Sequence, residues 1–253
     1  FASENLKNLF VPKMFGGEWA GTMCLTEPDA GSNLANIRTT AYPEGDHYRI
    51  KGSKIFISWG EHDLTENIVH LVLARMEGAP EGVRGISLFI VPKIRVDPDR
   101  ALGKPNGVLC ERVEEKLGLH ASPTCELIFG GHGECIGFLC GEANQGLSHM
   151  FQMMNEARID VGMGAAAIAS AAYYASLEYA KQRPQGRPIA GKDPLAPQVP
   201  IIEHADVKRM LLFQRAVVEG SLALIFQCAQ YVDLALVTEG EEKEKYELLL
   251  DLL

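Results

Sequence analysis

The sequence predicts an α+β chain with a β-barrel or sandwich followed by long helices. Three observations lead to this fold class. Short β-rich runs recur between turn signals up to residue 141, no proline interrupts residues 147–182, and alanine and methionine replace β-branched residues there. We therefore expect an antiparallel β-domain over residues 1–141 and the first part of a helical bundle over residues 142–253.

The expected strands are runs rich in β-branched and aromatic residues. Turn signals such as Pro43–Asp46, Lys51–Gly52 and Ala79–Gly82 separate several of them. The runs are Glu18–Leu25, Ile37–Tyr42, Tyr48–Ile50, Lys54–Ser58, Ile68–Ala74, Ile86–Val91 and Cys125–Phe129.

The second half has helical spacing. The first helix is expected over Leu147–Gln182, where apolar side chains recur every three or four residues and small residues line one face. The proline-rich segment Arg183–Pro200 predicts a long irregular connection. A second helix is expected over Glu203–Val237, a charged solvated link over Glu239–Lys245 and a third helix from Tyr246.

Composition restricts the kinds of partner and site. The formal net charge is −9 over 253 residues with a pI near 5.3, which disfavours nucleic acid and anionic membranes as partners. The six cysteines form no Cys-x-x-Cys pair, so we expect free thiols and a reducing, cytoplasmic location. His132 and Cys135 lack a second half at metal-ligand spacing, so no metal site is expected. No uninterrupted apolar run of about 18 residues occurs, so no membrane span is expected.

The segment Met23–Asn33 ends a strand in a turn. Pro28 fixes the turn, and Ala30, Gly31 and Ser32 leave backbone N–H groups and one hydroxyl available. Such a strand-end nest suits an anion such as a diphosphate. A loop that simply faces solvent explains the same residues equally well.

The segment Gly52–Gly60 places an aromatic ring beside a hydroxyl. In an alternating strand, Phe56 and Ser58 share one face, opposite Ile55 and Ile57. Together they would stack on and hydrogen-bond a flat heterocycle. For the strand alone, an aromatic in the barrel core is the better interpretation.

Together, these segments resemble the middle domain of the acyl-CoA dehydrogenase family. The shared pattern is Thr-Glu-Pro-x-Ala-Gly-Ser followed by Tyr-x-Ile-x-Gly-x-Lys-x-aromatic-Ile-Ser-x-Gly. The resemblance continues through residues 103–122, 141–146 and 154–158. Residues 183–204 resemble the large bacterial subgroup that includes methylmercaptopropionyl-CoA dehydrogenases.

The resemblance implies that the chain binds FAD. The backbone of Leu25 and Thr26, with the Thr26 hydroxyl, would face the pyrimidine edge of the flavin, where reduction places negative charge. Phe56 would lie on the dimethylbenzene side. Ser58 would hydrogen-bond N5, the atom that accepts hydride. Ser32 would reach the diphosphate or the pantetheine of the substrate.

Other positions complete the implied binding set. Met23 and Gly31 belong to the flavin-binding segment, and Arg183 matches an arginine that crosses to the diphosphate of a neighbouring subunit. Arg158 matches an arginine near the CoA arm. A surface ion pair between Arg158 and Glu156 is an equal alternative.

Some residues depart from the family pattern. Met23 replaces a frequent aromatic or leucine, Asn33 a frequent aspartate and Ala205 a frequent glutamine. Ala157 occupies the position where a minority of the family carries the catalytic base, and Glu156 would point about 100° away on a helix. We therefore assign no catalytic residue. We expect the base and the N-terminal helical domain to lie outside the chain, and the segment alone to be inactive.

The implied activity is α,β-dehydrogenation of an acyl-CoA thioester with hydride transfer to flavin N5. Acyl-CoA, an electron-transfer flavoprotein and further copies of the chain are the implied partners. One alternative is an alkylation-response-type flavoprotein of the same family that associates with DNA. A non-catalytic assembly module is another.

Overall fold

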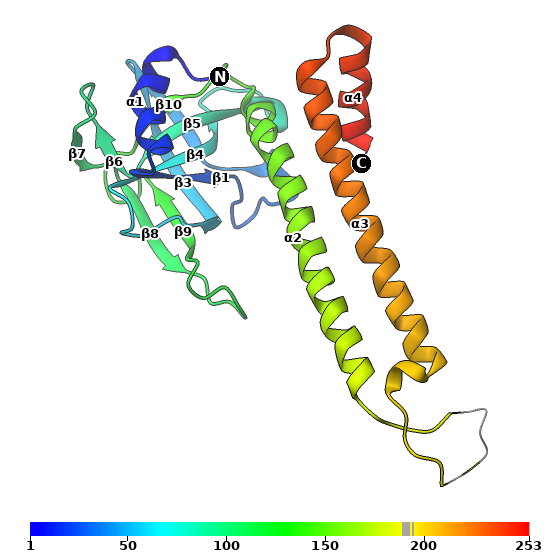
Figure 1. Cartoon of the computed structure of the whole chain (residues 1–253). Coiled ribbons are helices and arrows are strands. Elements are labelled where there is room, and N and C mark those ends of the chain that lie inside the picture. Colours follow the sequence, from blue (N-terminus) through cyan, green and yellow to red (C-terminus); the bar gives the residue numbers. More distant parts are fainter. Residues whose placement is uncertain (189–192, 194, 253) are drawn as a thin grey trace. The chain divides into compact units, whose positions relative to one another are not determined.

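The computed structural model describes residues 1–188, 193 and 195–252, apart from the side chain of Glu156. The chain forms two compact units, Phe1–Gln152 and Met153–Leu253. The first is a β-barrel and the second is helical (Figure 1). This confirms the predicted fold class, a β-rich domain followed by long helices. The division at residue 141 stays a prediction.

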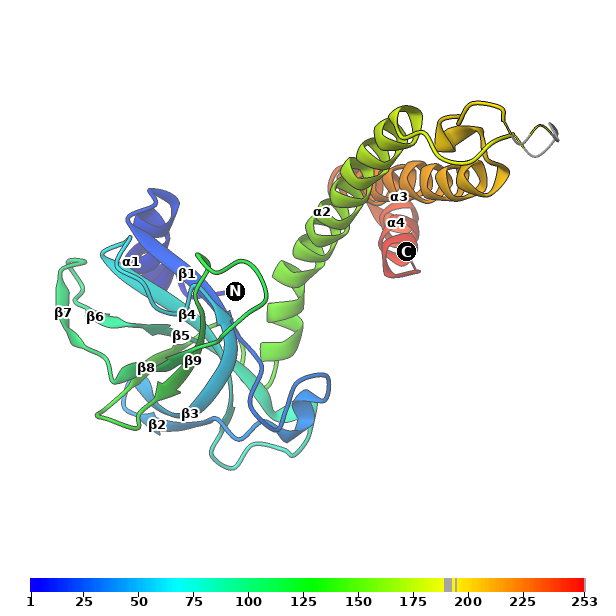
Figure 2. The same cartoon turned by 90° about the horizontal axis from the view of Figure 1, so that it is seen from below.

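The barrel closes because one strand pairs on both sides. The ring follows the order β4 (Asn67–Met76), β5 (Ile86–Pro92), β10 (Ile136–Leu139) and β3 (His47–Ser58). The short strand β2 (Thr40–Glu44) then pairs with both β3 and β4. The ring is thus complete. β1 (Trp19–Cys24) extends the sheet from β4, and β9 (Thr124–Phe129) and β8 (Val108–Val113) extend it from β3 (Figure 2).

The barrel is not wholly antiparallel. β1 and β2 each run parallel to β4, whereas the other pairings are antiparallel. A short 3₁₀ turn, η1 (Leu34–Asn36), lies in the connection that carries the chain from β1 to β2. β1 pairs with Asn67–Val72 and β2 with Arg75 and Met76 on the same edge of β4, so the connection leaves the sheet and returns to it further along that edge.

β4 and β5 are the most deeply buried strands of the barrel. Every residue of β5 is buried, and most residues of β4 are as well. Their near-continuous apolar sequences are typical of strands covered on both faces. The core cluster consists of Cys24, Ala41, Ile50, Ile57, Val72, Ala74, Phe89, Val91, Cys125, Leu127, Phe129 and Cys135.

Some elements were not predicted from the sequence. The strands β6 (Ile94–Val96), β7 (Leu102–Pro105), β8 and β10 are short or lack clear alternation, so pairing alone defines them. The helix α1 (Glu4–Phe15) was also missed. Its Phe10 is buried near Trp19 and Phe138, with ring centroids 6.2 and 6.3 Å away.

The second unit begins inside the long helix α2 (Gly146–Gln182). The 3₁₀ turn η3 (Ile201–Glu203) and the helix α3 (Ala205–Val237) follow, and α3 runs antiparallel to α2, with Gly162 facing Ile225 (Figure 1). α4 (Gly240–Leu252) packs on α3, where Tyr231 and Tyr246 stack. The prediction of a charged link over residues 239–245 was therefore wrong, because the Glu and Lys side chains that fill this segment favour helix.

Large apolar side chains remain exposed on α3, among them Leu212, Phe213 and Phe226. By length and composition, α3 would also be able to cross a membrane, with a mean hydropathy of 1.4 in its most apolar window. Charged residues interrupt its sequence, which is why no span was expected. A helix that is apolar on several faces is also typical of a bundle with neighbours on each side.

Gly146 allows α2 to start against the barrel. A side-chain carbon at this position would overlap the backbone of Ser87 and Leu88 in β5. Gly146→Ala should therefore lower the free energy of unfolding by about 1–3 kcal/mol, the usual effect of overpacking. Urea denaturation measures this change. The control is Gly164→Ala in the same helix, where nothing lies within 4 Å and helix propensity should add up to about 1 kcal/mol.

Candidate functional site

The end of β1 presents an accessible segment. Met23 is exposed, and Leu25 and Thr26 are half-buried. A tight turn follows, in which Glu27 N–H donates to Ala30 O at 2.8 Å and Ala30 N–H donates to Glu27 O at 3.1 Å. Gly31 and Ser32 follow the turn and are exposed. The residues predicted to bind a cofactor from this segment are thus all accessible from solvent.

A β-bulge in β3 determines which side chains of the Gly52–Gly60 segment are exposed. The register with β9 shifts between Lys54 and Ile57, and Phe56 has a left-handed φ of 60°. Strict alternation would put Lys54 on the same face as Phe56 and Ser58. Instead, the bulge lets both Lys54 and Ile57 point inward while Phe56 and Ser58 are exposed. Phe56 is 60% exposed and so does not belong to the barrel core.

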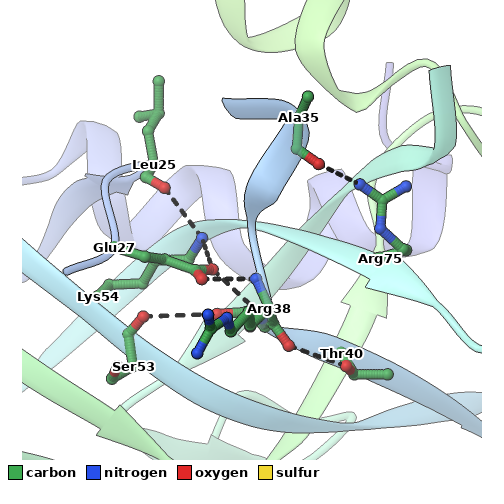
Figure 3. Close-up of polar contacts among 9 residues, drawn as sticks. Leu25, Glu27, Ala35, Arg38, Thr40, Ser53, Lys54 and Arg75 are labelled. Atoms are coloured by element: carbon green, nitrogen blue, oxygen red, sulfur yellow. Dashed lines mark hydrogen bonds and ion pairs between the residues drawn. The ribbon is translucent and has the colours of Figure 1, made fainter. Parts of the chain in front are cut away.

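The two segments lie together although 29 residues separate Thr26 from Ile55 in sequence numbering. Ile55 N–H donates to Thr26 O at 2.9 Å. Lys54 Nζ donates to Leu25 O at 3.0 Å (Figure 3). The structure therefore brings the end of β1 and the bulge of β3 side by side, and Met23, Thr26, Phe56 and Ser58 belong to this one region.

A buried ion pair fastens this region. Lys54 Nζ lies 2.9 Å from Glu27 Oε1, and the lysine side chain is 0% exposed. The other contacts of the Glu27 carboxylate are backbone N–H groups, from Arg38 at 2.6 Å and Thr39 at 3.0 Å (Figure 3). Arg75 holds the same connection by donating to Ala35 O at 3.1 Å. The loop between β1 and β2 is thus fixed to β3 and β4 from inside.

The pKa shifts of Glu27 and Lys54 bear on whether this buried pair is charged. Burial raises the pKa of Glu27, but the Lys54 ammonium and the N–H donors outweigh it and hold the pKa below the ordinary 4.5. Burial lowers the pKa of Lys54, against the attraction of Glu27. We assign the charged pair, because Lys54 donates to two oxygens and Glu27 accepts three donors. The contribution of Glu27 to stability is full above its unfolded pKa and is lost as pH falls through the lowered value.

Cys24 precedes this region in the core. Burial raises the pKa of its thiol to about 12, so it stays protonated and packs as a small apolar group. All six cysteines are free. Within the described part of the chain, no group of three histidine, cysteine or acidic side chains is placed to hold a metal ion.

Glu27 and Lys54 were not assigned a role from the sequence. The available signal was a lysine directly before the apolar run Ile55–Ile57, together with a glutamate at the start of a turn. Both also lie inside the family pattern. Neither signal indicates that the two side chains meet, since the contact depends on the bulge.

The remaining predicted residues belong to the second unit. Arg158 Nη2 donates to Asn155 Oδ1 at 2.6 Å. Glu156, the proposed alternative partner of Arg158, has a side chain outside the described atoms. Arg183 is exposed, and its carbonyl accepts from Ile201 N–H at 2.8 Å. The CoA and diphosphate roles of these arginines stay predictions.

Removal of Lys54 should destabilise the first unit. Lys54→Met leaves the buried Glu27 carboxylate without its countercharge, which typically costs about 3–5 kcal/mol. Urea denaturation followed by tryptophan fluorescence measures the loss. Lys51→Met is the matched control, an exposed lysine of the same strand, and should change stability by less than about 0.5 kcal/mol. Equal effects of the two variants would contradict the assignment of the pair.

The chain is similar to many proteins of one family. The family model "Acyl-CoA dehydrogenase, middle domain" matches residues 22–131, and "Acyl-CoA dehydrogenase, C-terminal domain" matches residues 144–243. The chain is 48% identical to 3-methylmercaptopropionyl-CoA dehydrogenase of Ruegeria pomeroyi over 97% of the chain's own length. It is 43% identical to a butyryl-CoA dehydrogenase of Syntrophomonas wolfei over 96%. It spans 41% of each of these relatives.

Solved structures of the same family are also similar to the chain. The acyl-CoA dehydrogenase of Geobacillus kaustophilus matches 90% of the chain with a TM-score of 0.71 at 28% identity, and the chain covers 54% of it. The butyryl-CoA dehydrogenase of Megasphaera elsdenii matches 90% with a TM-score of 0.67 at 25% identity, with 53% of it covered. The two family models together span most of the chain, including the β1 turn, the β3 bulge and the long helices. The chain therefore belongs to the acyl-CoA dehydrogenase family.

Proposed function

We propose that this chain is the flavin-binding part of an FAD-dependent acyl-CoA dehydrogenase. The observation that carries the proposal is the direct hydrogen bonding between the end of β1 and the bulge of β3, which brings the two parts of the family pattern into one exposed region. The proposed reaction is α,β-dehydrogenation of an acyl-CoA thioester. Its substrate is supported by the names of the relatives in Ruegeria and Syntrophomonas.

The residues of this region fit a flat heterocycle with acceptors along one edge. Phe56 and Met23 offer exposed apolar surface, and Ser58 offers an exposed hydroxyl. Thr26 contributes a backbone N–H that donates to no acceptor in the described part of the chain. These groups would hold FAD, whose isoalloxazine accepts a hydride from the substrate when bound.

Each side chain has a distinct task in the proposal. Leu25 and Thr26 present the polar edge, and Phe56 provides an apolar contact for the ring. Ser58 is proposed to donate to flavin N5, and Ser32, after the Glu27–Ala30 turn, to the diphosphate or pantetheine. Gly31 gives the backbone room beside it. No catalytic base is assigned, because Ala157 has no titratable group.

Further copies of the chain, an electron-transfer flavoprotein and a cytoplasmic location complete the proposal. Exposed apolar side chains on α3 support helix packing with other helices. The free cysteines are consistent with a reducing compartment. Arg183 is proposed to contact the FAD diphosphate of a neighbouring subunit, and Arg158 the CoA arm.

Flavin content tests the proposal directly. The full-length protein should purify with flavin absorbance, or gain it on addition of FAD, and the released cofactor should be FAD by mass spectrometry. An acyl-CoA thioester should then bleach the bound flavin under anaerobic conditions. A folded full-length protein that takes up no FAD would contradict the proposal.

Ser58 should affect the reduction of the flavin more than its binding. Ser58→Ala removes one proposed hydrogen bond, worth about 1 kcal/mol, so reduction by acyl-CoA should slow about fivefold while FAD is retained. Stopped-flow absorbance measures the rate. The control is Ser53→Ala in the same strand. Among the described residues its hydroxyl has no hydrogen-bond partner, and only its carbonyl accepts from Thr39 Oγ1, so its loss should not change the rate. An unchanged rate for Ser58→Ala would remove Ser58 from the site.

A further inference from the structure

The geometry points to Lys54 as a positioning residue for the flavin. Its ammonium holds the Leu25 carbonyl toward the barrel interior, so that the Thr26 N–H faces outward and is polarised as a donor for the flavin. The inference rests on the proposed FAD site. It assigns to a buried side chain, which cannot touch the cofactor, a role in setting how readily the cofactor is reduced.

The first step is the orientation of one peptide. Lys54 Nζ donates to Leu25 O at 3.0 Å from within the barrel (Figure 3). In a trans peptide the C=O and the following N–H point in opposite directions, and the chain contains no cis peptide bond. The Thr26 N–H is therefore directed away from Lys54. The next carbonyl, Thr26 O, accepts from Ile55 N–H at 2.9 Å, which fixes the following peptide and so holds Thr26 on both sides.

The second step is electrostatic. Lys54 is wholly buried, and hydrogen bonds in such surroundings polarise the groups that they join. An ammonium on the Leu25 carbonyl draws electron density toward the oxygen and makes the Thr26 N–H a stronger donor. A fixed donor of this kind stabilises an acceptor that becomes more negative during the reaction. Lys54 should therefore favour reduced over oxidised flavin.

This role is separable from holding the loop. Glu27 also accepts from Arg38 N–H and Thr39 N–H, and its own N–H and carbonyl close the turn with Ala30. Ile55 N–H attaches the loop to β3 without any lysine. Among these contacts, only that of Lys54 reaches the Leu25 carbonyl. Loss of Lys54 should thus change the peptide at Leu25 more than the turn that follows it.

The test measures flavin binding and potential in the full-length protein. Lys54→Met should bind oxidised FAD but prefer the reduced form about tenfold less than the unmodified protein does, a potential ~30 mV more negative for a two-electron couple. The control, Lys51→Met, should leave the potential unchanged. Spectroelectrochemical titration gives the potential, and fluorescence titration gives the affinity for oxidised FAD.

A second variant covers loss of folding. If Lys54→Met does not fold, the double variant Lys54→Met/Glu27→Gln tests the inference instead, because it leaves no unpaired buried charge. The flavin potential of the double variant should also be more negative than that of the unmodified protein. A folded, FAD-loaded variant with an unchanged potential would overturn the inference and leave the proposed function intact. Failure of the unmodified full-length protein to bind FAD would instead overturn the proposed function. A potential lowered equally by Lys51→Met would also overturn the inference, because the effect would not be specific to Lys54.

Discussion

The buried contact between Lys54 and Glu27 is the constraint on which the candidate site depends. Desolvation of two charges is expensive, so such a pair persists only where further hydrogen bonds satisfy both groups. Here Arg38 and Thr39 supply backbone donors to the carboxylate, and Leu25 supplies a second acceptor to the ammonium. The pair therefore fixes three separate stretches of chain at one point, namely the end of β1, the start of β2 and the middle of β3.

Barrel closure makes this arrangement possible. β2 pairs with both β3 and β4, and on β4 it continues the edge to which β1 is paired, so the chain leaves the sheet after β1 and re-enters it further along β4. The segment between them contains the Glu27–Ala30 turn and the 3₁₀ turn η1, and the Lys54 pair ties it down. The bulge of β3 then turns Phe56 outward at a left-handed φ of 60°. Such a conformation costs energy in a bulky residue and concentrates at functional sites.

The helical unit is held by packing between helices, and no buried ion pair joins its described residues. Within it, α2 and α3 run antiparallel with small residues such as Gly162 facing Ile225, while Phe213 and Phe226 remain exposed. Surface of that kind is typical of helices that bury it against further helices. The proposed role of Arg183, which would reach a neighbouring subunit, depends on such packing.

The sequence alone determined the succession of a β-rich part and long helices, and most of the longer elements within them. Alternation and apolar runs gave β1, β4, β5 and β9, because burial imposes those patterns locally. They also gave both halves of β3, but the turn expected at Lys51–Gly52 was wrong, because His47–Ser58 forms one continuous strand. Helical spacing gave α2 and α3 for the same reason. Thr26, Phe56 and Ser58 could be identified from the family pattern, and the structure places them in one region.

Tertiary structure decided what local pattern does not encode. The short strands β6, β7, β8 and β10 exist only through their partners, and the parallel pairing of β2 with β4 is what closes the barrel. Alternation implied that Lys54 shares a face with Phe56, yet the bulge turns the lysine inward, because its charge finds Glu27 and Leu25 O only there. A bulge and the contact it permits are properties of paired strands, so a single strand read by itself cannot contain them.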